Sequence, residues 1–145
     1  ETMCKIQINR HINVHGAYNY LYTSKDADGV RLSSSSPHSG NIRAEYNTRI
    51  PRYATVVNLS GNIMGKKKFD VLDELEIDGK KVEAYYQAKV NPYCLWDLTV
   101  SQYIMQNLRI TAGITNLFDY TSDRVTFNTS TSPGRNYFIA CNYTL

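Results

Sequence analysis

The residue types that could carry catalytic chemistry are few in this chain and are not spaced for it. The histidines are His11, His15 and His38, and none is accompanied by a serine and an aspartate in an arrangement typical of nucleophilic catalysis. The serine run from Ser33 to Ser36 is typical of a loop. We therefore expect no catalytic residue and no enzymatic activity.

Metal chemistry is equally weakly supported. An acidic stretch imitates the opening of a calcium-binding loop, but position twelve of that loop would be Tyr85, where a bidentate glutamate is required. The residues of this stretch are Glu74, Glu76, Asp78 and Gly79. The cysteines Cys4, Cys94 and Cys141 are odd in number, far apart and without a CxxC spacing. We expect neither a metal site nor a bound cofactor.

Length and composition indicate one folded unit. The 145 residues are 42% hydrophobic with a formal net charge of +3, which excludes a disordered chain. The pI near 8.7 is mild, and the cations form no stripe beyond Lys66 to Lys68, so nucleic acid is not an expected partner. No run approaches the 18 or more apolar residues of a spanning helix, so any membrane contact must be made by strands.

Most of the chain alternates between apolar and polar residues. From Asn41 to Ile50 every second residue from Asn41 onward is polar, whereas Ile42, Ala44 and Tyr46 lie on the other side of an extended strand. The same alternation recurs along the chain and predicts seven strands. They are Thr2–Ile8, Asn13–Thr23, Gly40–Ile50, Tyr53–Gly65, and three runs that include Leu98–Ser101, Leu108–Thr115 and Tyr137–Leu145.

The connections between these strands alternate between short and long. The short ones are Asn9–Asn13, Pro51–Arg52 and Met105–Asn107, and the long ones are Lys25–Ser39, Lys66–Asn91 and Asp119–Gly134. The Lys66–Asn91 segment holds six lysines and six acidic residues and is expected to be a solvated loop. Short turns at one end and long loops at the other predict an all-β, up-and-down antiparallel sheet with two unlike rims.

Strand length favours a membrane barrel over a soluble sheet. The expected strands approach the nine to eleven residues or so of a tilted membrane-crossing strand, and aromatic residues fall toward their ends. Cross-strand aromatic packing in a soluble β-sandwich binding module is the alternative. The expected interfacial girdle comprises Tyr20, Tyr22, Trp96 and Phe118 near the long loops, and Tyr53 and Tyr143 near the short turns.

Several motifs near the chain end resemble a known family. The stretch Leu95–Val100 reads LWDLTV, Asn116–Tyr120 reads NLFDY, Pro133–Phe138 reads PGRNYF, and the terminal run ends in Tyr143-Thr144-Leu145. In this order and spacing they resemble the final strands of TonB-dependent outer-membrane receptors. An earlier hairpin with Tyr20-Leu21-Tyr22 and Pro37–Asn41 is also similar, so the resemblance covers essentially the whole chain.

The resemblance implies the C-terminal part of a 22-stranded barrel in the bacterial outer membrane. The N-terminal plug domain and the other strands would lie outside residues 1–145. The implied function is energy-coupled uptake of a scarce chelate, such as a siderophore, haem or cobalamin, with a TonB-type coupling protein and membrane lipid as partners. Ligand contacts in such receptors come from extracellular loops, so His38, Tyr85 and Tyr86 are the candidate ligand-binding residues. A passive porin-like or adhesive barrel is the alternative.

Overall fold

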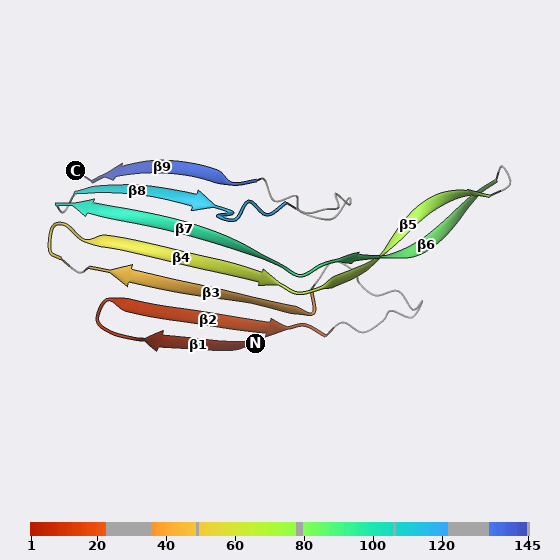
Figure 1. The fold of residues 1–145 in the computed structure, drawn as a ribbon, viewed down its shortest axis with the longest axis horizontal. Coiled ribbons are helices and arrows are strands. Elements are labelled where there is room, and N and C mark those ends of the chain that lie inside the picture. Colours follow the sequence, from red (N-terminus) through yellow and green to blue (C-terminus); the bar gives the residue numbers. More distant parts are fainter. Residues whose placement is uncertain (23–35, 49, 78–79, 106, 122–133, 145) are drawn as a thin grey trace.

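The computed structural model describes residues 1–22, 36–48, 50–77, 80–105, 107–121 and 134–144, with the backbone alone for residues 68–88. These residues form nine strands and include no helix able to cross a membrane. Seven strands build one antiparallel sheet in the order β1-β2-β3-β4-β7-β8-β9 (Figure 1). They are β1 (Thr2–Gln7), β2 (Ile12–Tyr20), β3 (His38–Asn47), β4 (Thr55–Met64), β7 (Tyr93–Ile104), β8 (Leu108–Thr115) and β9 (Asn136–Tyr143).

The register confirms that the sheet has one apolar and one polar face. Directly paired residues share a face, and one row of partners across the sheet is entirely apolar except for a tyrosine at its end. It runs Ile6, Val14, Ala44, Leu59, Leu98, Ile114 and Tyr137. We call the side of this row the apolar face and the other side, which holds Arg43, Asn58 and Thr99, the polar face.

The sheet is a single open layer. Val90 is the one buried hydrophobic residue in the described part of the chain, whereas side chains of the apolar face such as Ile110 and Ile139 remain exposed, Ile139 to 81%. A β-sandwich would bury this face against a second sheet. The sandwich alternative is therefore wrong, and the described residues leave the apolar face of the sheet uncovered.

Short turns join the strands at one end of the sheet, as predicted. At the β1–β2 turn, Asn9 Oδ1 accepts hydrogen bonds from the backbone N–H groups of His11 and Ile12 at 2.8 and 2.9 Å. In the β3–β4 turn, Arg52 has a positive φ of 70°, and Thr48 Oγ1 accepts from Thr55 N at 2.9 Å. These side chains supply acceptors for backbone groups that leave the sheet ladder.

Several strand ends were predicted wrongly. The strand expected to end at Ile50 ends at Asn47, because the β3–β4 turn needs the residues from Thr48 onward. Its start lies at His38 rather than Gly40, since His38 O accepts from Gly65 N at 2.8 Å and extends the pairing. Similarly, β2 ends at Tyr20 rather than Thr23, and β4 is confined to Thr55–Met64.

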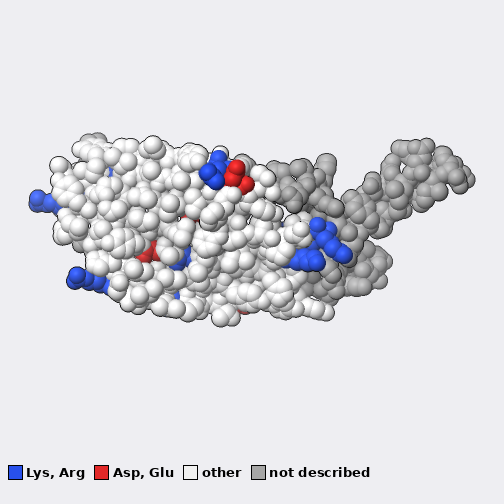
Figure 2. Space-filling view, viewed as in Figure 1, with Lys and Arg blue, Asp and Glu red and all other residues white. Residues whose placement is uncertain are grey.

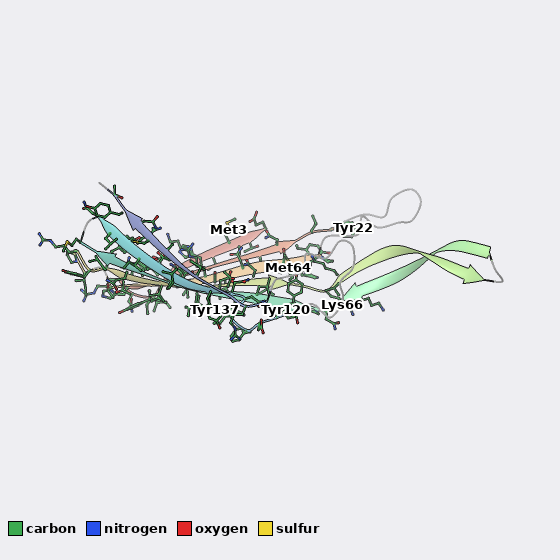
Figure 3. All side chains as sticks on the ribbon, turned by 90° about the horizontal axis from the view of Figure 1, so that it is seen from above. Met3, Tyr22, Met64, Lys66, Tyr120 and Tyr137 are labelled. Carbon is green, nitrogen blue, oxygen red and sulfur yellow. The ribbon has the colours of Figure 1, made fainter. Side chains whose placement is uncertain are left out.

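The segment predicted to be a charged loop forms a β-hairpin instead. Strands β5 (Lys67–Ile77) and β6 (Lys80–Val90) pair with each other and extend beyond the long-loop end of the sheet (Figures 1 and 3). The register places apolar residues opposite one another on one side of the hairpin, including Val71 with Tyr86 and Leu75 with Val82. The segment is extended rather than irregular because apolar and polar residues alternate along it. Its many charged residues make this alternation difficult to recognise in the sequence.

Two glycines of the sheet face aromatic rings on the neighbouring strand. A Cβ added at Gly61 would lie 2.9 Å from Cζ3 of Trp96, and a Cβ at Gly113 would meet the ring of Phe138 still more closely. Gly61 and Trp96 are register partners on the apolar face, and Gly113 and Phe138 are partners on the polar face. Each ring therefore lies over backbone that carries no side chain.

Candidate ligand-binding site

The polar face consists mainly of short neutral polar side chains and carries few charged ones. Arg43 donates to Asn58 Oδ1 at 3.0 Å and lies 3.7 Å from the carboxylate of Glu45. Across β7 and β8, the hydroxyls of Ser101 and Thr111 are 3.0 Å apart. Among the described residues, no buried side-chain nitrogen or oxygen lacks a hydrogen-bond partner. Such a surface suits a water-filled interior rather than a packed core.

The NLFDY motif forms a tight turn at the long-loop end of β8. Asn116 and Asp119 have positive φ angles of 52° and 56°, a conformation that asparagine and aspartate adopt more readily than most residues. The Asn116 side chain accepts from Tyr120 N and donates to Tyr120 O, both at 2.8 Å. Asn116 is only 5% exposed, and its backbone N–H donates to Asp97 Oδ1 at 2.9 Å. The motif thus fixes the backbone of Tyr120.

Tyr120 stacks on Tyr93, the first residue of β7. Their ring centroids are 5.0 Å apart and the planes differ by 8°. Tyr93 pairs with Met64, which places it on the polar side of the sheet. Met64 lies next to the root of the β5–β6 hairpin (Figure 3). We call Tyr93, Asp97, Asn116 and Tyr120 the mouth cluster. It presents an aromatic platform, held by hydrogen bonds, where the polar face meets the long loops.

The returning chain is tied to the same turn. Asp119 Oδ1 accepts from Arg135 N at 2.7 Å, so the two ends of the connection between β8 and β9 meet at this turn. A side-chain hydrogen bond with Tyr137 raises the pKa of the Arg135 guanidinium above its ordinary value, so this residue stays charged. The NLFD and PGR motifs therefore act together to close a loop.

Replacing Asn116 with alanine should loosen this turn. The variant loses both side-chain bonds to Tyr120 and leaves alanine at a positive φ, which together cost roughly 1–3 kcal/mol. We expect a lower urea midpoint for unfolding in detergent and faster proteolysis near Tyr120. Asn107→Ala, an exposed asparagine at the opposite end of β8, should change neither. Equal stability of both variants would contradict a structural role for the turn.

The predicted girdle residues lie near both ends of the sheet, with one exception. Tyr20 ends β2 and Tyr143 ends β9, both on the apolar face, whereas Tyr22, Tyr53 and Phe118 are exposed just outside strands. Trp96 lies inside β7 and packs over Gly61. Three further aromatic residues on the apolar face, which were not among the predicted girdle residues, follow the same distribution. They are Tyr18 and Tyr137 toward the long loops and Tyr46 toward the short turns.

His38 does not lie in a loop, contrary to expectation. As the first residue of β3 it pairs with Tyr20, and its Nδ1 lies 2.7 Å from the hydroxyl of Tyr18. Its ring lies 5.1 Å from the ring of Tyr20. These contacts place His38 among the aromatic residues of the apolar face. Its predicted role in ligand binding stays a prediction, and the geometry favours a role at the outer surface.

Tyr85 and Tyr86 lie on β6 of the hairpin, but on opposite sides of it. Tyr86 pairs with Val71 on the apolar side, and Tyr85 pairs with Leu72 on the side that carries most of the charges. Their ligand-binding role stays a prediction.

The mouth cluster was missed because its members are distant in sequence. The motif was recognised, but nothing in it shows that Tyr120 stacks on Tyr93, which lies 27 residues earlier on another strand. Figure 2 shows that charged side chains are sparse over the described part of the face in view, with lysines and arginines mainly toward its ends. Within the mouth cluster itself, Asp97 is the one charged residue, beside two tyrosines and an asparagine.

Solved structures with the same fold are siderophore receptors. The ferric enterobactin receptor PfeA of Pseudomonas aeruginosa, a variant crystallised with enterobactin, is 18% identical with a TM-score of 0.74, over 97% of this chain and 21% of that one. The ferripyoverdine receptor of the outer membrane of the same organism, with ferripyoverdine bound, is 17% identical with a TM-score of 0.72, over 96% of this chain and 18% of that one. A complex of FpvAI with pyocin S2 is also similar, with a TM-score of 0.68.

These neighbours are TonB-dependent receptor barrels, and the chain has the fold of a part of such a barrel. It spans about a fifth of the length of the receptors that it matches. Protein-family models give no match to the sequence, and curated proteins give none either.

Proposed function

We propose that the chain forms the C-terminal part of the barrel of a bacterial outer-membrane receptor that takes up a chelated metal. The observation that carries the proposal is the two-faced, seven-stranded sheet with short turns at one rim and long connections at the other. Its likeness to receptors solved with enterobactin and ferripyoverdine supports a siderophore-type cargo. The plug domain and the remaining strands belong to the rest of the receptor.

In this arrangement the apolar face meets lipid and the polar face lines the barrel interior. Aromatic side chains near both ends of the apolar face suit the two membrane interfaces. The long-connection rim, including the β5–β6 hairpin, faces the cell exterior, because its charges could not lie in hydrocarbon without large cost. The chain provides part of the barrel wall and part of its extracellular opening. We propose that it has no enzymatic activity.

Cargo would contact the mouth cluster first among the described residues. A stacked pair of tyrosines offers a rigid, amphipathic surface at low entropic cost, suited to a planar or aromatic chelate. Movement of the cargo inward requires energy, which we assign to a TonB-type coupling protein that acts through the plug. A passive porin-like barrel would need neither the stacked pair of Tyr93 and Tyr120 nor an energy-coupling protein.

Replacing Tyr120 with alanine in the intact receptor should weaken chelate binding by about 1–3 kcal/mol, the range of an interface hot spot. Tyr18→Ala is the matched control, because Tyr18 lies on the apolar face toward the same rim and should leave affinity unchanged. Equilibrium titration with ferric enterobactin and with ferripyoverdine measures the effect. Unchanged affinity in both variants would remove the mouth cluster from the binding site, and weaker binding only in Tyr18→Ala would reverse the two faces.

A further inference from the structure

The apolar face carries a groove at the long-loop end of strands β1 to β4. Its volume is about 420 Å³, within the size range of small-molecule sites. Gly16 and Gly40 form its floor, and Tyr18, Ile42 and Ile63 rise beside them. Large and small residues alternate across neighbouring strands here, which leaves a hollow in an otherwise continuous apolar surface.

The glycines in and beside the groove, Gly16, Gly40 and Gly61, differ in whether neighbouring atoms leave space for a side chain. At Gly40 an added Cβ would approach Ala17 O to 2.9 Å, and at Gly61 it would meet the Trp96 ring, so both positions lack a side chain for steric reasons. At Gly16 the nearest atom to an added Cβ, apart from its chain neighbours, would be Asn41 O at 3.9 Å, which is ordinary contact. Glycine weakens a strand. At position 16, no residue in the described part of the chain is close enough to exclude a side chain. The space above Gly16 is available to another molecule.

The end of the groove toward the long loops is polar. There the Tyr18 hydroxyl lies 2.7 Å from His38 Nδ1, and both residues line the groove. Tyrosine and histidine combine an apolar ring with a polar tip and are suited to the level of lipid headgroups. Thr2, which pairs with Tyr18, lies at the same end. Below it, the lining residues of the apolar face are glycine, cysteine and isoleucine, so the groove fits a molecule with a polar end at the rim and a hydrocarbon tail below.

We infer that this groove binds one acyl chain of an outer-leaflet membrane lipid, with the lipid headgroup beside Tyr18 and His38. The inference rests on the proposed function, since the apolar face must meet lipid with the long connections outermost. The groove is continuous with that lipid-facing surface, which selects a lipid over a soluble ligand. Because the groove lies on the opposite face from the mouth cluster, the bound chain would be separate from the cargo site.

The test compares lipid retention by the intact receptor and two variants. The receptor is stripped of lipid in detergent and titrated with lipid A, the acylated part of the lipid that forms the outer leaflet of a bacterial outer membrane, and retained lipid is counted by native mass spectrometry. We expect one tightly retained lipid, bound about tenfold more weakly in Gly16→Leu, whose side chain fills the groove. Ala112→Leu, on the exposed apolar face of β8, should retain lipid as the unmodified receptor does.

A second readout uses the native cysteines. Cys4 lines the groove, whereas Cys141 is exposed on the same face of β9 outside it. Bound lipid should slow alkylation of Cys4 by N-ethylmaleimide and leave Cys141 unchanged, and Gly16→Leu should remove this difference. Equal lipid retention by the receptor and Gly16→Leu would overturn the inference, as would a receptor dimer that Gly16→Leu dissociates. Chelate binding is measured in parallel, so its absence in the unmodified receptor would instead overturn the proposed function.

Discussion

Replacing Ala44 with arginine should strongly reduce the amount of assembled receptor in the outer membrane. Ala44 lies within β3 on the apolar face, in register with Val14 and Leu59. A cation near the bilayer midplane on the lipid side of a barrel strand costs about 2–4 kcal/mol, and a marginally stable fold loses much of its population at that cost. The measurement is the folded fraction in outer-membrane preparations, from heat-dependent mobility on electrophoresis.

Asn41→Arg is the matched control. Asn41 lies three residues earlier on the same strand and is exposed on the polar face, where the new cation can remain in water. We expect near-normal assembly for this variant. Similar losses in both variants would show that the apolar face does not meet lipid, and a loss confined to Asn41→Arg would mean that the two faces had been exchanged.

Deleting the TonB-type coupling protein should abolish uptake while leaving cargo binding at the cell surface intact. In the proposed receptor a plug closes the barrel, so cargo that reaches the mouth should not enter without work done on the plug. Uptake of radiolabelled ferric chelate by cells that depend on this receptor measures the first effect, and binding to chilled cells measures the second.

The control for this deletion is the same strain with the coupling protein restored from a plasmid, in which uptake should return. Full uptake without the coupling protein would favour the passive-barrel alternative. Loss of surface binding together with uptake would instead indicate that the receptor had not assembled, which the electrophoresis assay detects independently.

The two faces and the short turns could be predicted from sequence because both depend on local patterns. Alternation with period two assigns each residue of a strand to one side, and the register keeps those sides together across all seven strands. The turn at Pro51 and Arg52 was predicted from residue type and is present. Strand ends were less predictable, because a strand ends where the neighbouring strand no longer provides backbone hydrogen-bond partners.

The hairpin and the mouth cluster were not predictable by the same means. Charges dominate the composition of the β5–β6 segment and concealed its alternation, which becomes evident only when the two strands are paired. The stacking of Tyr93 and Tyr120 depends on two strands being brought together and on the bonds from Asn116 that fix Tyr120. His38 was assigned to a loop because the expected strand began at Gly40, although the pairing with β2 extends back to His38.

The glycine–aromatic pairs favour the observed alignment of strands that are joined by long connections. A tight turn fixes which residues lie opposite each other, but a long connection imposes no such constraint. Each of the three strand pairs joined by a long connection has a glycine directly opposite an aromatic residue. These pairs are Tyr18 with Gly40, Gly61 with Trp96, and Gly113 with Phe138. Sliding either of the last two strand pairs by one residue would move its aromatic ring away from the glycine and against a neighbouring side chain. These pairs therefore favour the observed alignment without constraining the length or sequence of the long connections.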